Sequence, residues 1–473
     1  MHKPAPRDDV ASLHDLSAAD MLAGFRSQQF SPSEVLDDLL SHVAAWEPHL
    51  KALYAFDPDG ARAAAKASTE RWHKGESAGS LDGVPVTIKD NIATKGVPVP
   101  LGAASVKLTP AASDAPPAAR LREAGAIIFS KTTMPDYGML SSGLSSFHPL
   151  TRNPWDLTKN PGGSSAGAGA AGAAGYGPLH VGTDIGGSIR LPASWCGLVG
   201  LKPSFGRVPI DPTYLGRVAG PMTRTVEDAA LMMCVLAKAD RRDGMCLPPD
   251  SLAWKTLEKS PRKLRLGLML RLEAGDPLQK EVREVTVKAA KAFEAAGAVV
   301  TEVDGFMTHE MLGGLDNFWR ARMWDDLLKL PEEERSRVLP YIYQWAEAAT
   351  KLSGLDVFRG YNVTTAMRAA AAKLFGEIDY LISPVSPGVK FPAEFASPVN
   401  DPAKPFEHIC YTVPWNMAEN PAISINAGYD KDGFPIGVQI VGRRFDDIGV
   451  LGMAKVFESL RGPQRPWPTP PKH

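Results

Sequence analysis

Cysteine and long apolar runs are both scarce in this chain. Four cysteines occur among 473 residues, and none of them form the C-x-x-C spacing that is typical of a zinc site or a disulfide framework. The chain contains no run of about 18 apolar residues, which a membrane-spanning helix would need. Its first residues lack the apolar core of a signal peptide. We therefore expect a cytoplasmic protein with reduced thiols. The thiols are Cys196, Cys234, Cys246 and Cys410.

An excess of one charge is also missing. Lys and Arg total 52 against 53 Asp and Glu, so the formal net charge is −1. This balance gives no electrostatic reason to expect a nucleic acid or an anionic membrane as a partner. No H-E-x-x-H or comparable ligand cluster occurs, so we expect no metal and no cofactor. Small-molecule chemistry is the remaining expectation.

Helical and extended patterns alternate along the chain. A helix is predicted to begin near Ser31, because Ser31 and Glu34 can form a capping box and Pro32 suits the first turn. Short apolar runs separated by helical patterns indicate an α/β fold. These runs cover residues 84–88, 126–130, 264–270, 298–303 and 380–384.

A hairpin is predicted near the C-terminus. Residues 422–429 and 434–442 are apolar runs that flank Asp-Lys-Asp-Gly at 430–433, and Asp-Gly favours a tight turn. The same four residues begin like a calcium loop, but the further ligands of such a loop are missing. An antiparallel hairpin combined with α/β alternation predicts a mixed sheet.

The glycine-rich run at 161–177 matches two motifs formally. Residues 167–172 read GAGAAG, which fits the dinucleotide fingerprint and would indicate an oxidoreductase. Residues 163–167 read GSSAG, which fits the nucleophile elbow with Ser165 at its centre. Both motifs require a buried strand directly before them, and the preceding residues do not form a strand pattern. We disfavour both interpretations.

A third interpretation joins separate pieces of sequence. Residues 83–91, 161–174 and 182–208 resemble the amidase-signature family, and residues 420–445 extend the resemblance. It implies an α/β fold in which one large domain, 1–473, has a mixed central sheet covered by helices on both sides. The domain would comprise an N-terminal helical part at 1–75, a signature core at 83–210 and a variable helical region at 300–375.

The resemblance also implies a Ser-Ser-Lys triad that hydrolyses carboxylic amides through an acyl-enzyme. The family's nucleophile corresponds to Ser188, its bridging serine to Ser164 and its lysine to Lys89, with the peptide bond before Ser164 in the cis form. Lys89 follows a strand pattern, and a lysine can act as a base only if burial keeps it neutral. His180 and Cys196 are interpreted as packing residues, because the family uses neither a histidine base nor a thiol nucleophile.

Glycines before Ser188 would let consecutive backbone N–H groups converge on an oxyanion. The expected oxyanion hole consists of Ile185, Gly186, Gly187 and Ser188. Residues expected to support the site without taking part in bond breaking are Ser165, Thr183, Asp184 and Arg190.

The family layout places residues 132–143 and 410–420 around the acyl group, where Tyr137 and Trp415 indicate an apolar or aromatic substrate. We expect a small-molecule amide substrate, no nucleic acid or membrane partner, and a chain that could form a homodimer. One alternative is the A-type subunit of a glutamine-dependent amidotransferase, but its tyrosine-rich run is absent here. Alternatives from other classes are a non-catalytic binding protein and the dinucleotide-binding oxidoreductase.

Overall fold

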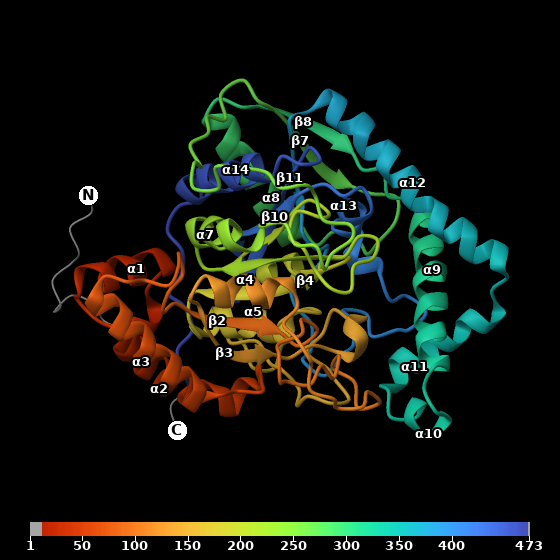
Figure 1. Cartoon of the computed structure of the whole chain (residues 1–473). Helices are drawn as coiled ribbons and strands as arrows, with labels where there is room; N and C mark the ends of the chain where they lie inside the picture. The colour runs from red at the N-terminus through yellow and green to blue at the C-terminus, as the bar shows by residue number, and fades with distance from the viewer. Residues whose placement is uncertain (1–11, 472–473) are drawn as a thin grey trace.

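A mixed sheet of 11 strands runs through the centre of the molecule (Figure 1). The computed structural model describes residues 12–471. Neighbouring strands follow the order β1-β3-β2-β4-β6-β5-β10-β11-β9-β7-β8. The pair β2 and β3 is parallel, whereas β10 and β11 are antiparallel. The strands are β1 (Leu53–Tyr54), β2 (Pro85–Lys89), β3 (Ile127–Thr132), β4 (Leu179–Asp184), β5 (Val199–Lys202), β6 (Val218–Thr223), β7 (Arg265–Arg271), β8 (Val299–Asp304), β9 (Tyr380–Pro384), β10 (Ala422–Tyr429) and β11 (Pro435–Gly442).

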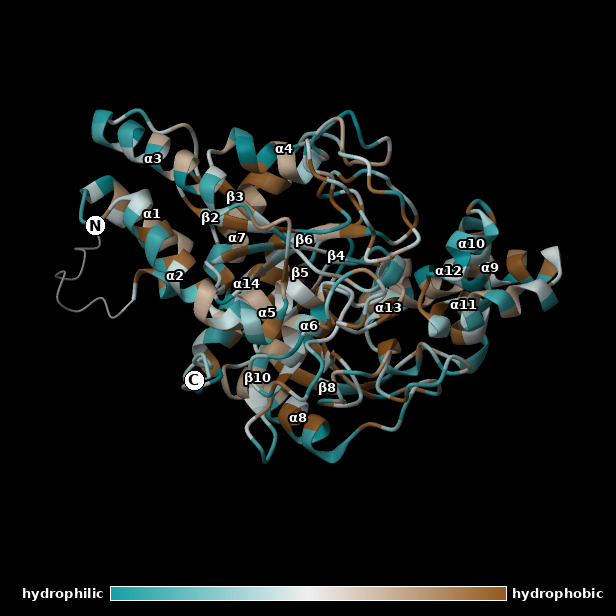
Figure 2. Ribbon diagram, turned by 90° about the horizontal axis from the view of Figure 1, so that it is seen from below, coloured by the Kyte–Doolittle hydropathy of each residue, from teal (hydrophilic) through white to brown (hydrophobic). Residues whose placement is uncertain are grey.

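Helices flank this sheet. Figure 1 shows the first three helices together at one edge of the molecule and α9 to α12 at the opposite edge. Figure 2 shows apolar segments gathered along the central strands, with hydrophilic segments on outer helices such as α3. The helices are α1 (Ala18–Ser27), α2 (Pro32–Leu50), α3 (Pro58–Lys74), α4 (Pro116–Glu123), α5 (Ala166–Ala174), α6 (Arg190–Cys196), α7 (Val226–Leu236), α8 (Lys280–Ala295), α9 (His309–Leu328), α10 (Glu332–Arg335), α11 (Pro340–Glu347), α12 (Gly354–Glu377), α13 (Val413–Met417) and α14 (Asp447–Leu460).

The core divides between the two faces of the sheet. Helices α7, α8 and α14 contribute to one large apolar cluster, which also contains Ala219 of β6. Met222, three residues further along the same strand, belongs to a different cluster with residues of α5 and α6. Because successive side chains of a strand point to opposite faces, the sheet is covered on both sides, as the resemblance implied.

The predicted strands and the hairpin are confirmed. β2, β3, β7, β8 and β9 coincide with the five predicted runs within one or two residues. The helix near Ser31 is α2, with the predicted capping box between Ser31 and Glu34. Strands β4, β5 and β6 were not predicted, although they occupy the middle of the sheet.

Two sequence expectations concern a signal peptide at the N-terminus and a membrane-spanning helix. Residues 1–11, which include most of the start that lacks a signal-peptide pattern, lie outside the described residues. Between residues 12 and 471, no helix combines the length and the apolar character needed to cross a membrane.

The glycine-rich run forms α5, a helix buried along its whole length. A Cβ atom on Gly167 would lie 2.4 Å from the backbone nitrogen of Thr133, so the helix touches its neighbours too closely for larger side chains. GAGAAG therefore lies inside a buried helix. A dinucleotide fingerprint instead lies at the turn between a strand and a helix, so that interpretation does not hold.

Candidate active site

Strand β2 ends at Lys89, whose side chain is fully buried. Its Nζ atom donates a hydrogen bond to Oγ of Ser164 at 2.7 Å and another to Oγ1 of Thr183 at 2.9 Å. Asn91 also donates to Oγ1 of Thr183, at 3.1 Å. The amine is thus held between two hydroxyl groups, on a strand that cannot move independently of the sheet.

The environment of Lys89 favours its neutral form. Burial lowers the pKa of Lys89 most, and the guanidinium of Arg217 lowers it further. The carboxylates of Asp184 and Asp90 act in the opposite direction, and the net result is a pKa well below the usual range of a lysine. A neutral amine has a lone pair, so it can accept a proton.

Ser164 lies in the turn before α5. The peptide bond between Gly163 and Ser164 is cis, as the resemblance implied. A Cβ atom on Gly163 would lie 2.6 Å from the backbone nitrogen of Ser142, so only glycine fits there. The next residue, Ser165, is fully buried and its hydroxyl donates to the carbonyl of Thr183 at 3.2 Å. This contact leaves Ser164, rather than Ser165, as the hydroxyl next to Lys89.

Ser188 lies in the loop between β4 and α6. Only 8% of Ser188 is exposed, and the backbone N–H of Ser165 donates to its carbonyl at 3.2 Å. The loop contains Gly187 with φ of 130°, a conformation that favours glycine. A Cβ atom there would lie 2.6 Å from Oγ1 of Thr412. The loop that carries Ser188 is therefore held by close packing on both sides.

A buried ion pair supports this loop from beneath. Arg190 donates to Asp184 at 3.0 Å, and both side chains are fully buried. Burial raises the pKa of Asp184, but the guanidinium of Arg190, the charge of Lys202 and a hydrogen bond from Asn416 together hold that pKa well below its usual range. The remaining donors of Arg190 reach the Thr412 carbonyl, Oδ1 of Asn416 and Oε1 of Gln439. Sequence reasoning did not identify these three acceptors, because no local pattern links them to the loop.

The backbone N–H groups of the loop have different partners. The N–H of Gly187, which was expected to face an oxyanion, donates to Oδ1 of Asp184 at 2.8 Å. Within residues 12–471, no group accepts a hydrogen bond from the N–H of Ile185, Gly186 or Ser188. The same three residues line a pocket, so their donors are available to a molecule bound there.

That pocket is mainly apolar and aromatic. Its wall includes residues from the predicted segment 132–143, from α9 and from the segment before α13. The lining residues are Gly138, Met139, Leu140, Ser141, Ile185, Gly186, Ser188, Trp319, Arg322, Ala396, Pro405, Phe406 and Ile409. Trp319 and Phe406 pack edge to face, with ring centroids 5.1 Å apart.

The two aromatic residues expected in this pocket lie elsewhere. Trp415 is buried between Phe306 and Phe375, and its indole N–H donates to the carbonyl of Tyr411. Tyr137 is half-buried and its hydroxyl is hydrogen-bonded to Ser105 at 2.8 Å, although its neighbour Gly138 lines the pocket. The aromatic residues that line this pocket are instead Trp319 and Phe406.

A sequence model of the amidase family matches residues 34–451. The chain belongs to the amidase family. It is accordingly an enzyme that hydrolyses amides. An acylamidase of Rhodococcus erythropolis is 35% identical over 468 residues, which cover 96% of this chain and 97% of that protein. The A-type subunit of the glutamyl-tRNA(Gln) amidotransferase of Chloroflexus aurantiacus is 32% identical over 488 residues, covering 95% of this chain and 98% of that protein. The crystal structure of a bacterial aryl acylamidase of the amidase signature family superposes with a TM-score of 0.87 at 30% identity, covering 95% and 96% of the two chains.

His180 and Cys196 lie near this amidase site in sequence but are engaged elsewhere. The ring of His180 is hydrogen-bonded to Thr87 and to the carbonyl of Gly177, and burial lowers its pKa to about 3. Burial raises the pKa of Cys196, and its thiol donates to the carbonyl of Pro161 at 3.4 Å. Both residues are buried in the packed interior.

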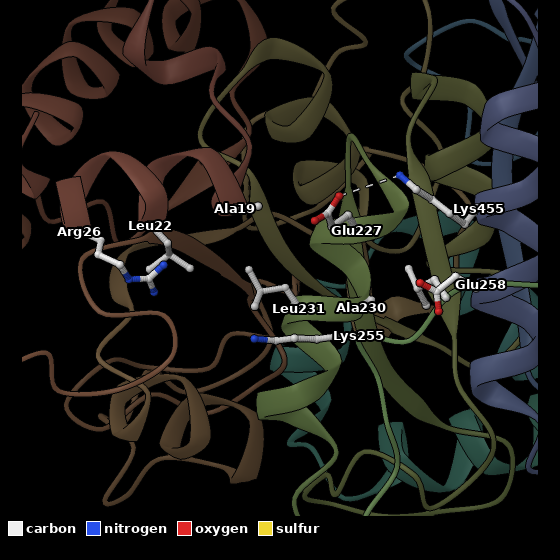
Figure 3. Close-up of a pocket in the computed structure, with 10 residues that line it drawn as sticks. Ala19, Leu22, Arg26, Glu227, Ala230, Leu231, Lys255, Glu258 and Lys455 are labelled. Carbon is white, nitrogen blue, oxygen red and sulfur yellow. Dashed lines mark ion pairs between the residues drawn. The ribbon is translucent and has the colours of Figure 1, made fainter. Parts of the chain in front are cut away.

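A larger cavity of about 440 Å³ lies apart from these residues, between α1, α7 and α14 (Figure 3). Leu22 and Leu231 contribute apolar surface, and Glu227 pairs with Lys455 across one side at 4.0 Å. None of the residues expected in the active site lines it.

Proposed function

We propose that this amidase is a stand-alone hydrolase in which Ser188 is the nucleophile and Lys89, acting through Ser164, is the base. The observation that carries the proposal is the 2.7 Å contact between Nζ of Lys89 and Oγ of Ser164, formed where burial lowers the pKa of the amine well below its usual range. No carboxylate among residues 12–471 forms an ion pair with Lys89, whose amine is instead hydrogen-bonded to the hydroxyl groups of Ser164 and Thr183.

The proposed reaction uses these three residues in turn. Neutral Lys89 accepts the proton of the Ser164 hydroxyl, and Ser164 accepts the proton of Ser188 as its oxygen bonds to the amide carbon. The carbonyl oxygen becomes an oxyanion, which accepts hydrogen bonds from the N–H groups of Ile185, Gly186 and Ser188.

The proton then returns through Ser164 to the amide nitrogen, the C–N bond breaks, and the acyl group remains on Ser188. Water attacks the acyl-enzyme by the same route and releases the carboxylate.

Three features support an apolar or aromatic amide as the substrate. Trp319 and Phe406 face the pocket, and most of its other lining side chains are apolar. The similar acylamidase and aryl acylamidase have names that indicate acyl amides and aryl amides, respectively.

Asp184 and Arg190 hold the loop in place, and Ser165 and Thr183 orient the serines and the lysine.

A second candidate is the A-type subunit of an amidotransferase, which the similarity to the Chloroflexus aurantiacus protein favours. The chain lacks the tyrosine-rich run of that subfamily in the corresponding part of α12, at 360–375. A purified chain that hydrolyses amides without any partner supports the stand-alone enzyme. Glutamine hydrolysis that requires added partner subunits supports the alternative.

A fluorophosphonate probe with mass spectrometry tests the nucleophile. We expect one adduct per chain on Ser188, none on Ser165, and no adduct in Ser188→Ala. Ser459→Ala, which removes an exposed hydroxyl near the end of α14, is the matched control and should label like wild type. Aryl amide hydrolysis should disappear together with the adduct. An adduct on Ser165, or hydrolysis that persists in Ser188→Ala, would refute the proposal.

A further inference from the structure

The pocket beside Ser188 contains one charged side chain, Arg322 of α9. Its other lining side chains are apolar or small, apart from the serines. Trp319 lies three residues earlier on the same helix face. The ring of Trp319 is packed on the loop, since a Cβ atom on Gly186 would lie 3.4 Å from it. Helix α9 therefore directs both an indole and a guanidinium toward the space next to Ser188.

Arg322 has no carboxylate partner within the described part of the chain. Its guanidinium stacks over the ring of Tyr214 at 4.6 Å. Arg217 approaches the same ring at 5.2 Å and is itself buried, with hydrogen bonds to backbone carbonyls only. By contrast Arg320, two residues before Arg322, pairs with Asp316 at 2.5 Å. Stacking on Tyr214 leaves the edge of the Arg322 guanidinium available to a ligand.

An unpaired, half-buried cation in an apolar pocket is complementary to an anion. A guanidinium binds a carboxylate through two parallel hydrogen bonds, and this interaction is stronger where water is excluded. Arg217 adds positive potential beside Arg322, and two of its N–H groups donate to the carbonyls of Pro212 and Asn91.

We propose that Arg322 determines specificity by binding a carboxylate on the acyl part of the substrate, so that this enzyme prefers amides of dicarboxylic acids with an apolar or aromatic spacer. The inference rests on the proposed function, because it takes the pocket beside Ser188 as the acyl pocket. One end of the substrate lies at Ser188, the spacer packs on Trp319 and Phe406, and the carboxylate reaches Arg322.

Paired substrates test this assignment. The aromatic pair is 4-carbamoylbenzoate and 4-acetylbenzamide, which has a neutral acetyl group in place of the carboxylate. Succinamate and adipamate, each with its neutral methyl ketone analogue, vary the spacer length. Ammonia release measures kcat and KM for wild type, Arg322→Met, Arg322→Lys and Arg241→Met. Arg241 is exposed and does not line the pocket, so its variant controls for the loss of one positive charge.

We expect wild type to prefer at least one carboxylated substrate by about 10- to 100-fold in kcat/KM, mainly through KM. Arg322→Met should abolish the preference and retain activity on neutral amides. Arg322→Lys should recover part of it, and Arg241→Met should match wild type. A wild type without preference at every spacer length, or an Arg322→Met variant that keeps the preference, overturns the inference.

Binding separates this inference from the proposed function. Calorimetry with the Ser188→Ala protein measures binding of 4-carbamoylbenzoate and 4-acetylbenzamide without turnover. Tighter binding of the carboxylate that disappears in Ser188→Ala/Arg322→Met supports the role of Arg322 even if the mechanism proposed above fails. Equal binding of the two ligands to Ser188→Ala overturns the role of Arg322. It does not bear on the proposed nucleophile, which is tested separately by labelling Ser188 in the wild-type protein.

Discussion

Replacing Arg190 by methionine should destabilise the protein, because it leaves the carboxylate of Asp184 buried without its partner. Both side chains are fully buried and joined at 3.0 Å. Removing one member of such a pair costs about 3–5 kcal/mol. Unfolding entropy is about 2.1 cal/mol/K per residue, so a chain of 473 residues loses about 1 °C of Tm for each kcal/mol. The Tm should therefore fall by about 3–5 °C.

The pH dependence of this loss has a definite sign. In the native protein the pKa of Asp184 is depressed, so its contribution to stability is present above the unfolded value of about 3.9 and is lost as pH falls through the lower folded pKa. In Arg190→Met we expect burial to outweigh the remaining effects of Lys202 and Asn416, so that the folded pKa of Asp184 rises above the unfolded value. Stability is then lost as pH rises through that folded pKa. The difference in Tm between the two proteins should be larger at neutral pH than at about pH 5.

Differential scanning calorimetry across this pH range measures the effect. Arg271→Met is the matched control, because Arg271 pairs with Asp304 at 2.8 Å where both side chains are more than half exposed. Such a pair contributes about 0–1 kcal/mol. Adding Asp184→Asn to Arg190→Met should recover part of the Tm by removing the unpaired charge. The reasoning would be refuted if Arg190→Met had the same Tm as Arg271→Met. It would also be refuted if the loss of Tm in Arg190→Met/Asp184→Asn equalled the sum of the losses in the two single variants.

Three further predictions concern the site. Arg217→Met should raise the pKa of Lys89, because the charge of Arg217 helps to lower it. The acid limb of the kcat/KM profile should then move to higher pH, whereas Arg217→Lys, which keeps the charge, should leave that limb in place. Gly187→Ala should lower kcat by about 100-fold or more, because its Cβ would lie 2.6 Å from Thr412, while Gly313→Ala on α9, with open space around it, should keep full activity in the same assay. Activity should survive EDTA and iodoacetamide, because the proposed chemistry uses neither a metal nor a thiol; loss on chelation that zinc restores would contradict this.

Local patterns predicted those parts of the fold where side chains alone determine the structure. The strands that were found are rich in Val, Ile and Leu, as in β7 and β9. The strands that were missed contain Gly182 and His180 in β4 and Gly220 and Pro221 in β6, which are poor strand formers. They are strands because neighbours on both sides supply hydrogen bonds, as β2 and β6 do for β4. That pairing is tertiary and leaves no local signal.

The same contrast between local sequence patterns and tertiary packing applies to the candidate site. Lys89, Ser164 and Ser188 could be proposed from the sequence because they belong to recognisable motifs, and the structure brings Lys89 within 2.7 Å of Ser164 from 75 positions away. Trp319 and Arg322 line the pocket but were not named from the sequence, because α9 reaches the pocket only through packing of the variable region. Trp415 was placed in the pocket from its segment alone, although its ring faces the core.

Lys89 tests the central claim most directly. Steady-state kinetics of wild type and Lys89→Ala against pH, with circular dichroism to confirm folding, measures both the contribution of the base and its titration. We expect a folded variant whose kcat falls by several orders of magnitude, and a wild-type profile that falls on the acid side at a pH well below the usual pKa of lysine. A folded Lys89→Ala protein with near-native kcat on its best amide would contradict the Ser-Ser-Lys mechanism.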